Sequence, residues 1–432
     1  MPLLEKFFSL KDNGTTVRTE LLAGLTTFLT MAYIIFVNPA ILGDAGLPKD
    51  AVFVATCLAA ALGSAIMALY ANYPIGMAPG MGLNAYFAYG VVLGMGVPWP
   101  TALGAVFISG CLFVLVSVFK LRAMLVNGIP PSLRTAIAVG LGLFLALIAL
   151  KSAGIVVAHP ATMVAAGDLH KPAALMAIFG FLLIVTLDRL RVTGAILIGI
   201  VAVTALSFVF GGNRFAGLVS APPSIDPTLF KLDIGAALST GVLNVVLVFF
   251  LVELFDATGT LMGVAQRAGL LVDGNMARLN KALLADSCAI VAGSMLGTSS
   301  TTAYIESAAG VQAGGRTGLT ALTVALLFLA CLFIAPLARI VPAYATAPAL
   351  LFVGCLMLRD LALIDWSDST ESIPAAITAL MIPFTYSIAH GIAFGFITYA
   401  ALKLATGRAR HVKPVVWVIA AVFTFKYAYL PG

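Results

Sequence analysis

Three carboxylates stand inside otherwise apolar segments and are the residues best suited to chemistry. Glu253 and Asp256 lie in LVELFDATGTLMG (251–263), and Glu306 lies in SSTTAYIESAAGV (299–311). Neither segment contains Lys or Arg. A charged side chain in the middle of a membrane helix costs about 2.5–3.5 kcal/mol on the insertion scale. We therefore expect these acids to face a polar cavity, and at least one of them to carry a proton.

The spacing of these acids relates them to helix faces and helix ends. Glu253 and Asp256 are three residues apart, so they share one face of a helix. Glu306 comes at the start of a short helix, where a carboxylate interacts favourably with the helix N-terminus. The alternative for Glu253 or Asp256 is a structural hydrogen bond to the backbone of a broken helix.

Other polar and aromatic residues near these acids are weaker candidates. Asn84 offers both a donor and an acceptor, and is either functional or a helix N-cap. Threonines in membrane helices usually bond their own backbone, and aromatic residues usually pack, so each of the remaining candidates has a structural alternative. These candidates are Thr27, Phe28, Phe255, Thr302 and Tyr304. Asp286, beside Lys281 near a helix start, is expected to form a structural ion pair.

Two interruptions of apolar runs occur at matching places in the two halves of the chain. The first extends from Gly76 to Asn84, the second from Gly297 to Thr302, and a short helix is expected after each. Unwound backbone must line a cavity or face protein, because hydrocarbon cannot satisfy its polar groups. Paired interrupted spans in inverted halves indicate a transporter site near the membrane midplane. The alternative is a pair of ordinary kinks or glycine-mediated helix contacts.

The composition is typical of a protein whose apolar segments span a membrane. Of 432 residues, 61% are hydrophobic and 10% are charged, and the mean hydropathy is +1.08. A spanning helix uses about 20 residues, so the apolar content suits an all-α polytopic protein of about 14 spans. The composition excludes a soluble enzyme, a disordered protein and a nucleic-acid binder. The predicted spans are 21–42, 51–71, 85–97, 101–120, 132–150, 172–188, 193–210, 235–264, 283–297, 303–314, 317–337, 343–358, 373–386 and 390–405.

The spans divide into two sets of seven with opposite orientation. The predicted parts are an N-terminal segment (1–20), a first inverted repeat (21–211), a connecting loop (212–234), a second repeat (235–405), and a basic linker with an apolar C-terminal segment (406–432). The segment 412–430 is either an extra span or a surface segment. Most of the 24 lysines and arginines fall on one side of this arrangement, which predicts a cytoplasmic N-terminus in a multi-pass protein of the cytoplasmic (inner) membrane.

Motifs for catalysis are missing from the sequence. It contains no P-loop, no HExxH and no GxSxG, and its five cysteines are scattered through apolar stretches. We therefore predict no enzyme activity, no metal site and no cofactor other than a coupling proton.

Six strings of residues resemble one family of transporters. They are LTTFLTMAYIIFVNP (25–39), APGMGLNAYF (78–87), ELFDATGTLMG (253–263), NKALLADS (280–287), GTSSTTAYIESAAGV (297–311) and AGGRTGLTAL (313–322). These strings are similar to those of the azaguanine-resistance type of purine permease, a branch of the nucleobase–cation symporter-2 (nucleobase–ascorbate transporter) family. The resemblance covers nearly the whole chain.

The resemblance implies a fold and a function. The fold would be a 7+7 inverted repeat with core and gate domains, and the activity would be proton-coupled uptake of adenine, guanine or hypoxanthine. Asn84, Glu253 and Glu306 match positions that the family uses for substrate, and Asp256 matches one needed for transport. A homodimer through the gate domain is also implied. Many members of the wider family carry a His or an acid four residues after the second acid, where this chain has Thr260, so the proton carrier stays open between Glu253 and Asp256.

The chemistry of a purine agrees with these acids. A carboxylate accepts hydrogen bonds from ring N–H groups, whereas a protonated carboxyl donates one to a ring nitrogen. The alternative function is an anion carrier or channel of the same fold, for sulfate or bicarbonate, because helix N-termini suit anions. Such a site would be positively charged, and neither interruption contains a basic residue.

Overall fold

A computed structural model describes residues 2–119, 128–210, 217–239, 242–267, 269–272, 275–276 and 278–429. These residues are mostly helical, and ten of their helices are long and apolar enough to cross a membrane. Those spans are Val17–Asp44, Lys49–Ala71, Trp99–Val118, Pro131–Ser152, Pro172–Arg189, Leu243–Gln266, Leu279–Leu296, Gly318–Arg339, Ala343–Leu363 and Ile388–Ala405. Shorter apolar helices cover Met81–Gly94, Ala195–Phe210 and Pro414–Ala428.

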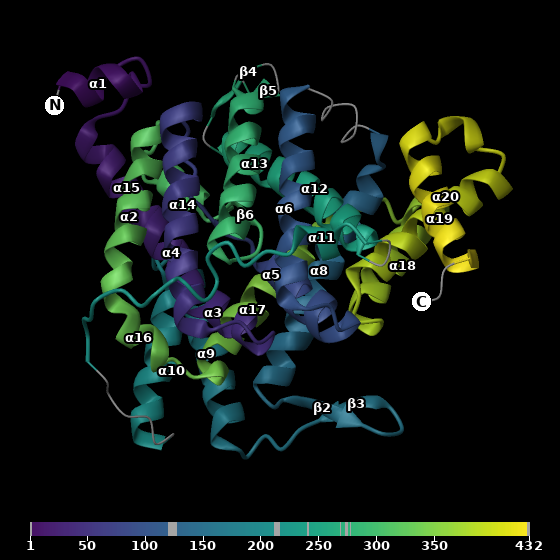
Figure 1. The fold of residues 1–432 in the computed structure, drawn as a ribbon, viewed down its shortest axis with the longest axis horizontal. Coiled ribbons are helices and arrows are strands. Elements are labelled where there is room, and N and C mark those ends of the chain that lie inside the picture. The colour runs from purple at the N-terminus through teal and green to yellow at the C-terminus, as the bar shows by residue number, and fades with distance from the viewer. Residues whose placement is uncertain are drawn as a thin grey trace. The chain divides into compact units, whose positions relative to one another are not determined.

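The chain forms two compact units, each assembled from segments distant in the sequence (Figure 1). Unit 1 comprises Met1–Val118 and Ala149–Ala349, and unit 2 comprises Phe119–Ile148 and Leu350–Gly432. Each unit therefore draws residues from both predicted repeats, whose boundaries stay a prediction. Residues 120–127, 211–216 and 430–432, which include parts of the predicted loop and C-terminal segment, lie outside the described residues.

Unit 1 contains most of the helices and all three strand pairs of the described chain. Its elements are α1 (Pro2–Phe8), α2 (Val17–Met31), α3 (Ile34–Asp44), α4 (Lys49–Ile66), the π-helix η1 (Met67–Ala71), β1 (Met77–Pro79), α5 (Met81–Ala85), the π-helix η2 (Tyr86–Gly94), α6 (Trp99–Val118), β2 (Val156–His159), β3 (Met163–Ala166), α9 (Pro172–Arg189), α10 (Ala195–Phe210), α11 (Ile234–Ala237), α12 (Leu243–Arg267), β4 (Leu271–Val272), β5 (Asn275–Met276), α13 (Leu279–Leu296), β6 (Thr301–Ala303), α14 (Ser307–Gln312), α15 (Gly318–Cys331), η3 (Leu332–Ile334) and α16 (Ala335–Arg339).

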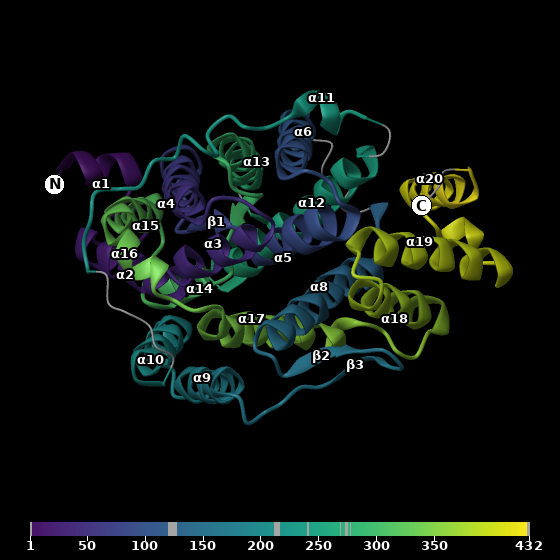
Figure 2. The ribbon, with the colours of Figure 1, turned by 60° about the horizontal axis from the view of Figure 1, so that its bottom comes forward.

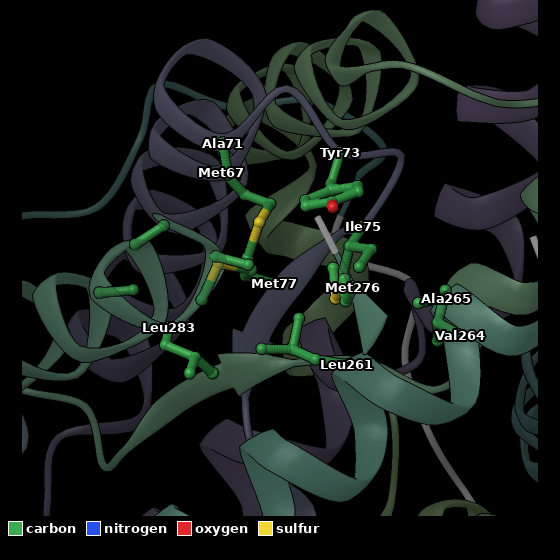
Figure 3. Packing of buried hydrophobic residues seen from close by; sticks show 14 of the residues in the cluster. Met67, Ala71, Tyr73, Ile75, Met77, Leu261, Val264, Ala265, Met276 and Leu283 are labelled. Atoms are coloured by element: carbon green, nitrogen blue, oxygen red, sulfur yellow. The ribbon is translucent and has the colours of Figure 1, made fainter. Parts of the chain in front are cut away.

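Helix packing in unit 1 surrounds the two interruptions. Helix α13 packs against both α4 and α6, and α15 packs against α2 and α4 (Figure 2). The short helix α14 packs against α2 and α12. A buried cluster joins η1 and β1 to α12 and α13, and it includes Met67, Met77, Leu261 and Leu283 (Figure 3). This apolar packing fixes the spans that carry the interruptions.

Unit 2 is a smaller helical group. It holds η4 (Leu358–Leu363), α18 (Ser369–Phe384), α19 (Ile388–Ala405), η5 (Ala409–His411) and α20 (Pro414–Tyr429), and it shares α8 (Pro131–Ser152) and α17 (Ala343–Met357) with unit 1. Helix α19 packs along α18, and α20 packs against α19. The segment predicted at 412–430 therefore forms a helix of 16 residues.

Caps and turns in the sequence explain where several helices begin and end. Thr16 accepts a hydrogen bond from the N–H of Thr19 at the start of α2, and Asp368 accepts one from the N–H of Thr370 at the start of α18. Such caps satisfy N–H groups that have no partner inside the helix. Helix α13 ends at Gly297, whose φ of 93° lies in the left-handed region that favours glycine.

The structure corrects two expectations about the elements. The all-α prediction left out the strand pairs β1–β6, β2–β3 and β4–β5, all antiparallel. The predicted span 235–264 is interrupted, because α11 ends at Ala237 and α12 begins only at Leu243. Asp233 caps α11 by accepting from the N–H of Ala236 at 2.9 Å, which makes this turn a separate short helix.

The exposed surface of α9 suits lipid rather than water. Leu175, Phe179 and Leu182 recur at helical spacing on this helix and are 54%, 46% and 59% exposed. Large contiguous apolar patches are rare on the surfaces of soluble proteins. In a bilayer the same side chains contact hydrocarbon, so this surface agrees with a multi-pass membrane protein.

Candidate functional site

The two interruptions pair with each other through their backbones. Strands β1 and β6 run antiparallel, with Met77 opposite Ala303 and Pro79 opposite Thr301. The ladder extends at both ends, because the N–H of Gly80 donates to Ser300 O at 2.9 Å and that of Tyr304 to Gly76 O at 3.0 Å. The unwound backbone therefore satisfies its polar groups within protein, as a membrane interior requires.

Serine hydroxyls complete the backbone pairing around the crossing. Ser307 accepts from the N–H of Gly76 at 3.0 Å, and Ser64 accepts from that of Met77 at 2.8 Å. Gly80 is needed for close approach, because a Cβ there would lie 2.9 Å from a methyl carbon of Thr302. The crossing is thus a rigid platform from which α5 and α14 begin.

Glu253 lies fully buried in α12 beside this platform. Its Oε2 accepts a hydrogen bond from the hydroxyl of Ser109 on α6. Its Oε1 has no hydrogen-bond partner within the described part of the chain, and Ser300 of the second interruption lies close to the same carboxyl. Ser109 therefore fixes one oxygen of Glu253, and the other oxygen lies on the side of the second interruption near Ser300.

Asp256 and Asp286 extend the acidic group. Asp256 follows Glu253 by three residues on α12 and interacts electrostatically with both Asp286 and Glu306. Asp286 on α13 accepts from the hydroxyl of Thr302 at 3.0 Å and from the N–H of Ala303 at 2.9 Å. This acid therefore holds β6 in place.

The ion pair expected between Asp286 and Lys281 is wrong. Lys281 lies with its ammonium 5.6 Å from the centre of the Tyr70 ring, and the ion pairs of the described residues do not include it. Asp286 is fully buried, where two donors from the second interruption replace the base.

Glu306 is the N-cap residue of α14, at the predicted helix start. Its side chain makes no capping hydrogen bond; instead, its Oε1 accepts from the hydroxyl of Tyr33 at 2.6 Å. Its backbone carbonyl accepts from the hydroxyl of Thr30 at 3.3 Å. The first span thus contacts the second interruption at this acid.

Asn84 links the two interruptions by side chains. Its Oδ1 accepts from the hydroxyl of Ser299, and its Nδ2 donates to Pro79 O at 3.5 Å. Asn84 lies within α5, whose N-cap residue is Gly80, so the N-cap alternative is wrong. Tyr304 also donates its hydroxyl to Pro79 O, at 2.6 Å.

The remaining candidates lie at different depths in this region. Thr27 of α2 is fully buried beside Gly310 of α14, where a Cβ would collide with its hydroxyl. Phe28 packs edge-on against Phe328 of α15, with ring centres 5.3 Å apart. Phe255 is half-buried on α12. The structure brings Asn84, Thr302, Tyr304 and the acids together, and it gives Phe28 a packing contact.

Sequence reasoning missed three residues that bind these side chains, Tyr33, Ser109 and Ser299. It also assigned Asp286 the wrong partner. The three missed residues are hydroxyl donors, which are common in membrane helices and carry no spacing signal of their own. Ser299 lies inside the second interruption, so the sequence located its segment but did not single out the residue.

Among the described residues, the site offers carboxylates, hydroxyls and an amide, and no ion-pair partner for its three acids. None of the five ion pairs among the described residues includes Glu253, Asp256 or Glu306. Such a set suits a neutral ligand rich in N–H groups and acceptor nitrogens, together with a proton. Unit 2 contains a separate cavity of about 390 Å³, whose wall includes Glu371 and Tyr399.

Comparison with known proteins decides the family. A family model described as "Permease family" (Xan_ur_permease) matches residues 18–394. The chain belongs to this permease family. The permease is 48% identical to "Adenine permease AdeP" of Escherichia coli (strain K12) over 429 residues, which cover 99% of this chain and 96% of the relative. It is 45% identical to "Guanine/hypoxanthine permease PbuO" of Bacillus subtilis (strain 168), with 96% and 98% covered.

The fold of the permease also occurs in solved transporters. It matches the transmembrane domain of the cyanobacterial bicarbonate transporter BicA with a TM-score of 0.66, covering 86% of this chain and 97% of that chain. At 16% sequence identity this likeness shows the fold alone. The protein is thus a multi-pass membrane transporter and not an enzyme, and its resemblance to purine permeases is confirmed.

Proposed function

We propose that this protein is a proton-coupled symporter that imports purine nucleobases (adenine, guanine or hypoxanthine) across the cytoplasmic membrane. The observation that carries the proposal is the group of three acids, Glu253, Asp256 and Glu306, beside two paired interruptions and without a basic partner among the described residues. The relatives named for adenine and for guanine and hypoxanthine support the substrate class.

The chemistry of a purine fits the atoms available. Glu253 keeps Oε1 for ring or amino N–H groups while Ser109 holds Oε2. Asn84 and Glu306 are proposed to bind the opposite edge, and Thr302 holds its part of the site through Asp286. A purine analogue that lacked a matching hydrogen bond would leave one of these buried groups unpaired, which gives strong discrimination. Phe255, Tyr304, Phe28 and Thr27 are proposed to line the ring faces or support the residues that do.

The proposed coupling to protons rests on the carboxylates that have no Lys or Arg partner among the described residues. A carboxylate removed from water without a base is stabilised by taking up a proton. If a purine binds best when one of Glu253, Asp256 and Glu306 is protonated, the substrate and the proton favour each other's binding reciprocally. The proton gradient then drives accumulation of the base, and no other cofactor is proposed.

The proposed membrane arrangement completes this function. It consists of a 7+7 inverted repeat with core and gate domains, a cytoplasmic N-terminus, an inner-membrane location and a homodimer through the gate domain. The interruptions in β1–α5 and β6–α14 support this arrangement, because paired broken spans are typical of transporters built from inverted repeats. An anion carrier is disfavoured, because the described site contains acids and no Lys or Arg.

The test is radiolabelled uptake in cells that lack their own purine carriers. Adenine, hypoxanthine, guanine and uracil are compared with and without a protonophore. Saturable uptake of a purine that the protonophore abolishes is the expected result and names the substrate. Transport of sulfate or bicarbonate with no uptake of any base would overturn the proposal.

A further inference from the structure

A tyrosine at a break in the first span contacts one of the three acids. Helix α2 ends at Met31 and α3 begins at Ile34, so Tyr33 lies in the turn between them. Its side chain is 1% exposed, and its hydroxyl donates to Oε1 of Glu306 at 2.6 Å. The break is a kink and not an unwound segment, because Ala32 and Tyr33 keep helical φ and ψ within the span Val17–Asp44. This kink meets the second interruption through the bond from Tyr33.

Few other groups act on Glu306. Asp256 faces it from α12, Tyr304 precedes it in the chain, and both interact with it electrostatically. The Thr30 hydroxyl contacts the backbone carbonyl of Glu306 at 3.3 Å and not its carboxyl, and its shorter bond is to Thr27 O at 2.7 Å. Within the described part of the chain, Tyr33 therefore supplies the one side-chain hydrogen bond to this carboxyl.

A donor of this kind discriminates between the two forms of an acid. A phenol O–H stabilises an ionised carboxylate more than a protonated carboxyl, because the negative oxygen is the stronger acceptor. Removal of the carboxyl from water opposes this, because a charged group loses more hydration than a neutral one. The balance between this burial and the hydrogen bond from Tyr33 thus determines how readily Glu306 holds a proton.

We propose that Tyr33 is a positioning residue that sets the pH at which Glu306 takes up and releases its proton. The inference rests on the proposed function, in which that proton is coupled to the purine. Tyr33 links the break in the first span to the charge of Glu306, so a change at that turn alters protonation of the site.

Tyr304 provides a matched control. Like Tyr33, it is a buried tyrosine that donates through its hydroxyl at 2.6 Å, but its acceptor is the backbone oxygen of Pro79. Tyr304→Phe removes the same atom from the same site without removing a hydrogen bond to an acid. It controls for loss of a hydroxyl and for loss of packing.

The experiment titrates the Glu306 carboxyl in the purified full-length protein by infrared spectroscopy. The C=O band of the protonated acid is assigned by its absence in Glu306→Gln. In Tyr33→Phe the midpoint pH of the Glu306 titration is expected to rise by about one pH unit, because a hydrogen bond to a charged group is lost. Tyr304→Phe is expected to leave the midpoint near that of the unmodified protein.

Uptake measured against pH gives the second readout. The pH of half-maximal purine uptake is expected to rise in Tyr33→Phe by the same interval, whereas in Tyr304→Phe this pH is expected to stay near that of the unmodified protein, whatever happens to the rate. If Tyr33→Phe does not fold, 3-fluorotyrosine at position 33 keeps the ring and is a stronger donor, so the midpoint is expected to fall.

The outcomes separate this inference from the proposed function. A midpoint unchanged in Tyr33→Phe, or unchanged with fluorotyrosine where Phe does not fold, overturns the inference even when purine uptake is intact. So does an equal rise in Tyr304→Phe. If Tyr33→Phe shifts the midpoint of the Glu306 titration but the unmodified protein transports no purine, the proposed function is overturned. The action of Tyr33 on Glu306 then still stands.

Discussion

The two units bury carboxylates beside different partners. In unit 2, Glu371 of α18 accepts from the ammonium of Lys403 at 2.7 Å and from the hydroxyl of Tyr399 at 3.0 Å. In unit 1, Glu253 and Glu306 accept from hydroxyl groups and have no ion-pair partner among the described residues. One carboxylate has a base beside it, and the others have only neutral donors.

This difference separates a structural acid from acids suited to exchange protons. An acid beside a buried ammonium forms an ion pair, and losing either partner leaves an uncompensated charge. An acid buried among hydroxyls gains less from being charged, so a proton competes effectively for it. We therefore assign stability to the Glu371–Lys403 pair and transport to the acids of unit 1.

The largest expected effect comes from removing one charge in each unit. Glu253→Gln is expected to lower purine uptake by about 100-fold, equivalent to about 2.7 kcal/mol, because an amide cannot exchange the proton and has a donor NH2 group in place of one acceptor oxygen. Glu371→Gln is expected to lower stability while uptake per folded molecule changes little. Uptake is normalised to the amount of protein in the membrane.

The assignment of a purely structural role to Glu371 would be wrong if Glu371→Gln abolished uptake in a well-folded protein. The assignment of transport to Glu253 would be wrong if Glu253→Gln transported purines normally with an intact dependence on the proton gradient. The amount and monodispersity of each purified variant distinguish loss of function from loss of folding.

A smaller effect is expected from the base of unit 2. Lys403 is 5% exposed and also donates to the hydroxyl of Thr370 at 2.7 Å. Lys403→Met leaves Glu371 without its ion-pair partner and is expected to lower the free energy of unfolding by about 3 kcal/mol. This value is the lower end for a buried pair, because the Glu371 side chain is 23% exposed. The measurement is unfolding in mixed micelles with increasing sodium dodecyl sulfate.

The double variant Lys403→Met with Glu371→Gln serves as the control. It removes both charges, so most of the lost stability is expected to return. A double variant no more stable than Lys403→Met alone would show that the pair contributes through packing rather than charge.

The acids of unit 1 could be predicted from the sequence, whereas the ion pair of unit 2 could not. Glu253, Asp256 and Glu306 are conspicuous because acids without bases are costly in apolar segments. Glu371 lies near the start of α18, where an acid is unremarkable, and Lys403 lies 32 positions later near the end of α19. Nothing in local spacing indicates that they pair.

The same limit explains what was missed at the site. The two interruptions could be located from their glycines and polar residues, but the pairing of Met77 with Ala303 joins positions more than 200 residues apart. Tyr33 looked like an ordinary residue of an apolar span, since periodicity does not reveal a turn of two residues. Long-range contacts of this kind depend on the tertiary fold.

The smallest expected effect concerns the acid at the start of α18 in unit 2. Asp368 caps α18, and hydrogen bonds from the hydroxyl and the N–H of Thr370, together with Arg408, lower the pKa of its carboxyl. Because the pKa is lower in the folded protein, the stabilisation is present above about pH 4, the ordinary value, and is lost as the pH falls further. Asp368→Asn is therefore expected to flatten the fall in melting temperature between pH 5 and pH 3, with Asp12→Asn as an exposed control. Equal flattening by both variants would show that general surface charge, and not this cap, produces the acid sensitivity.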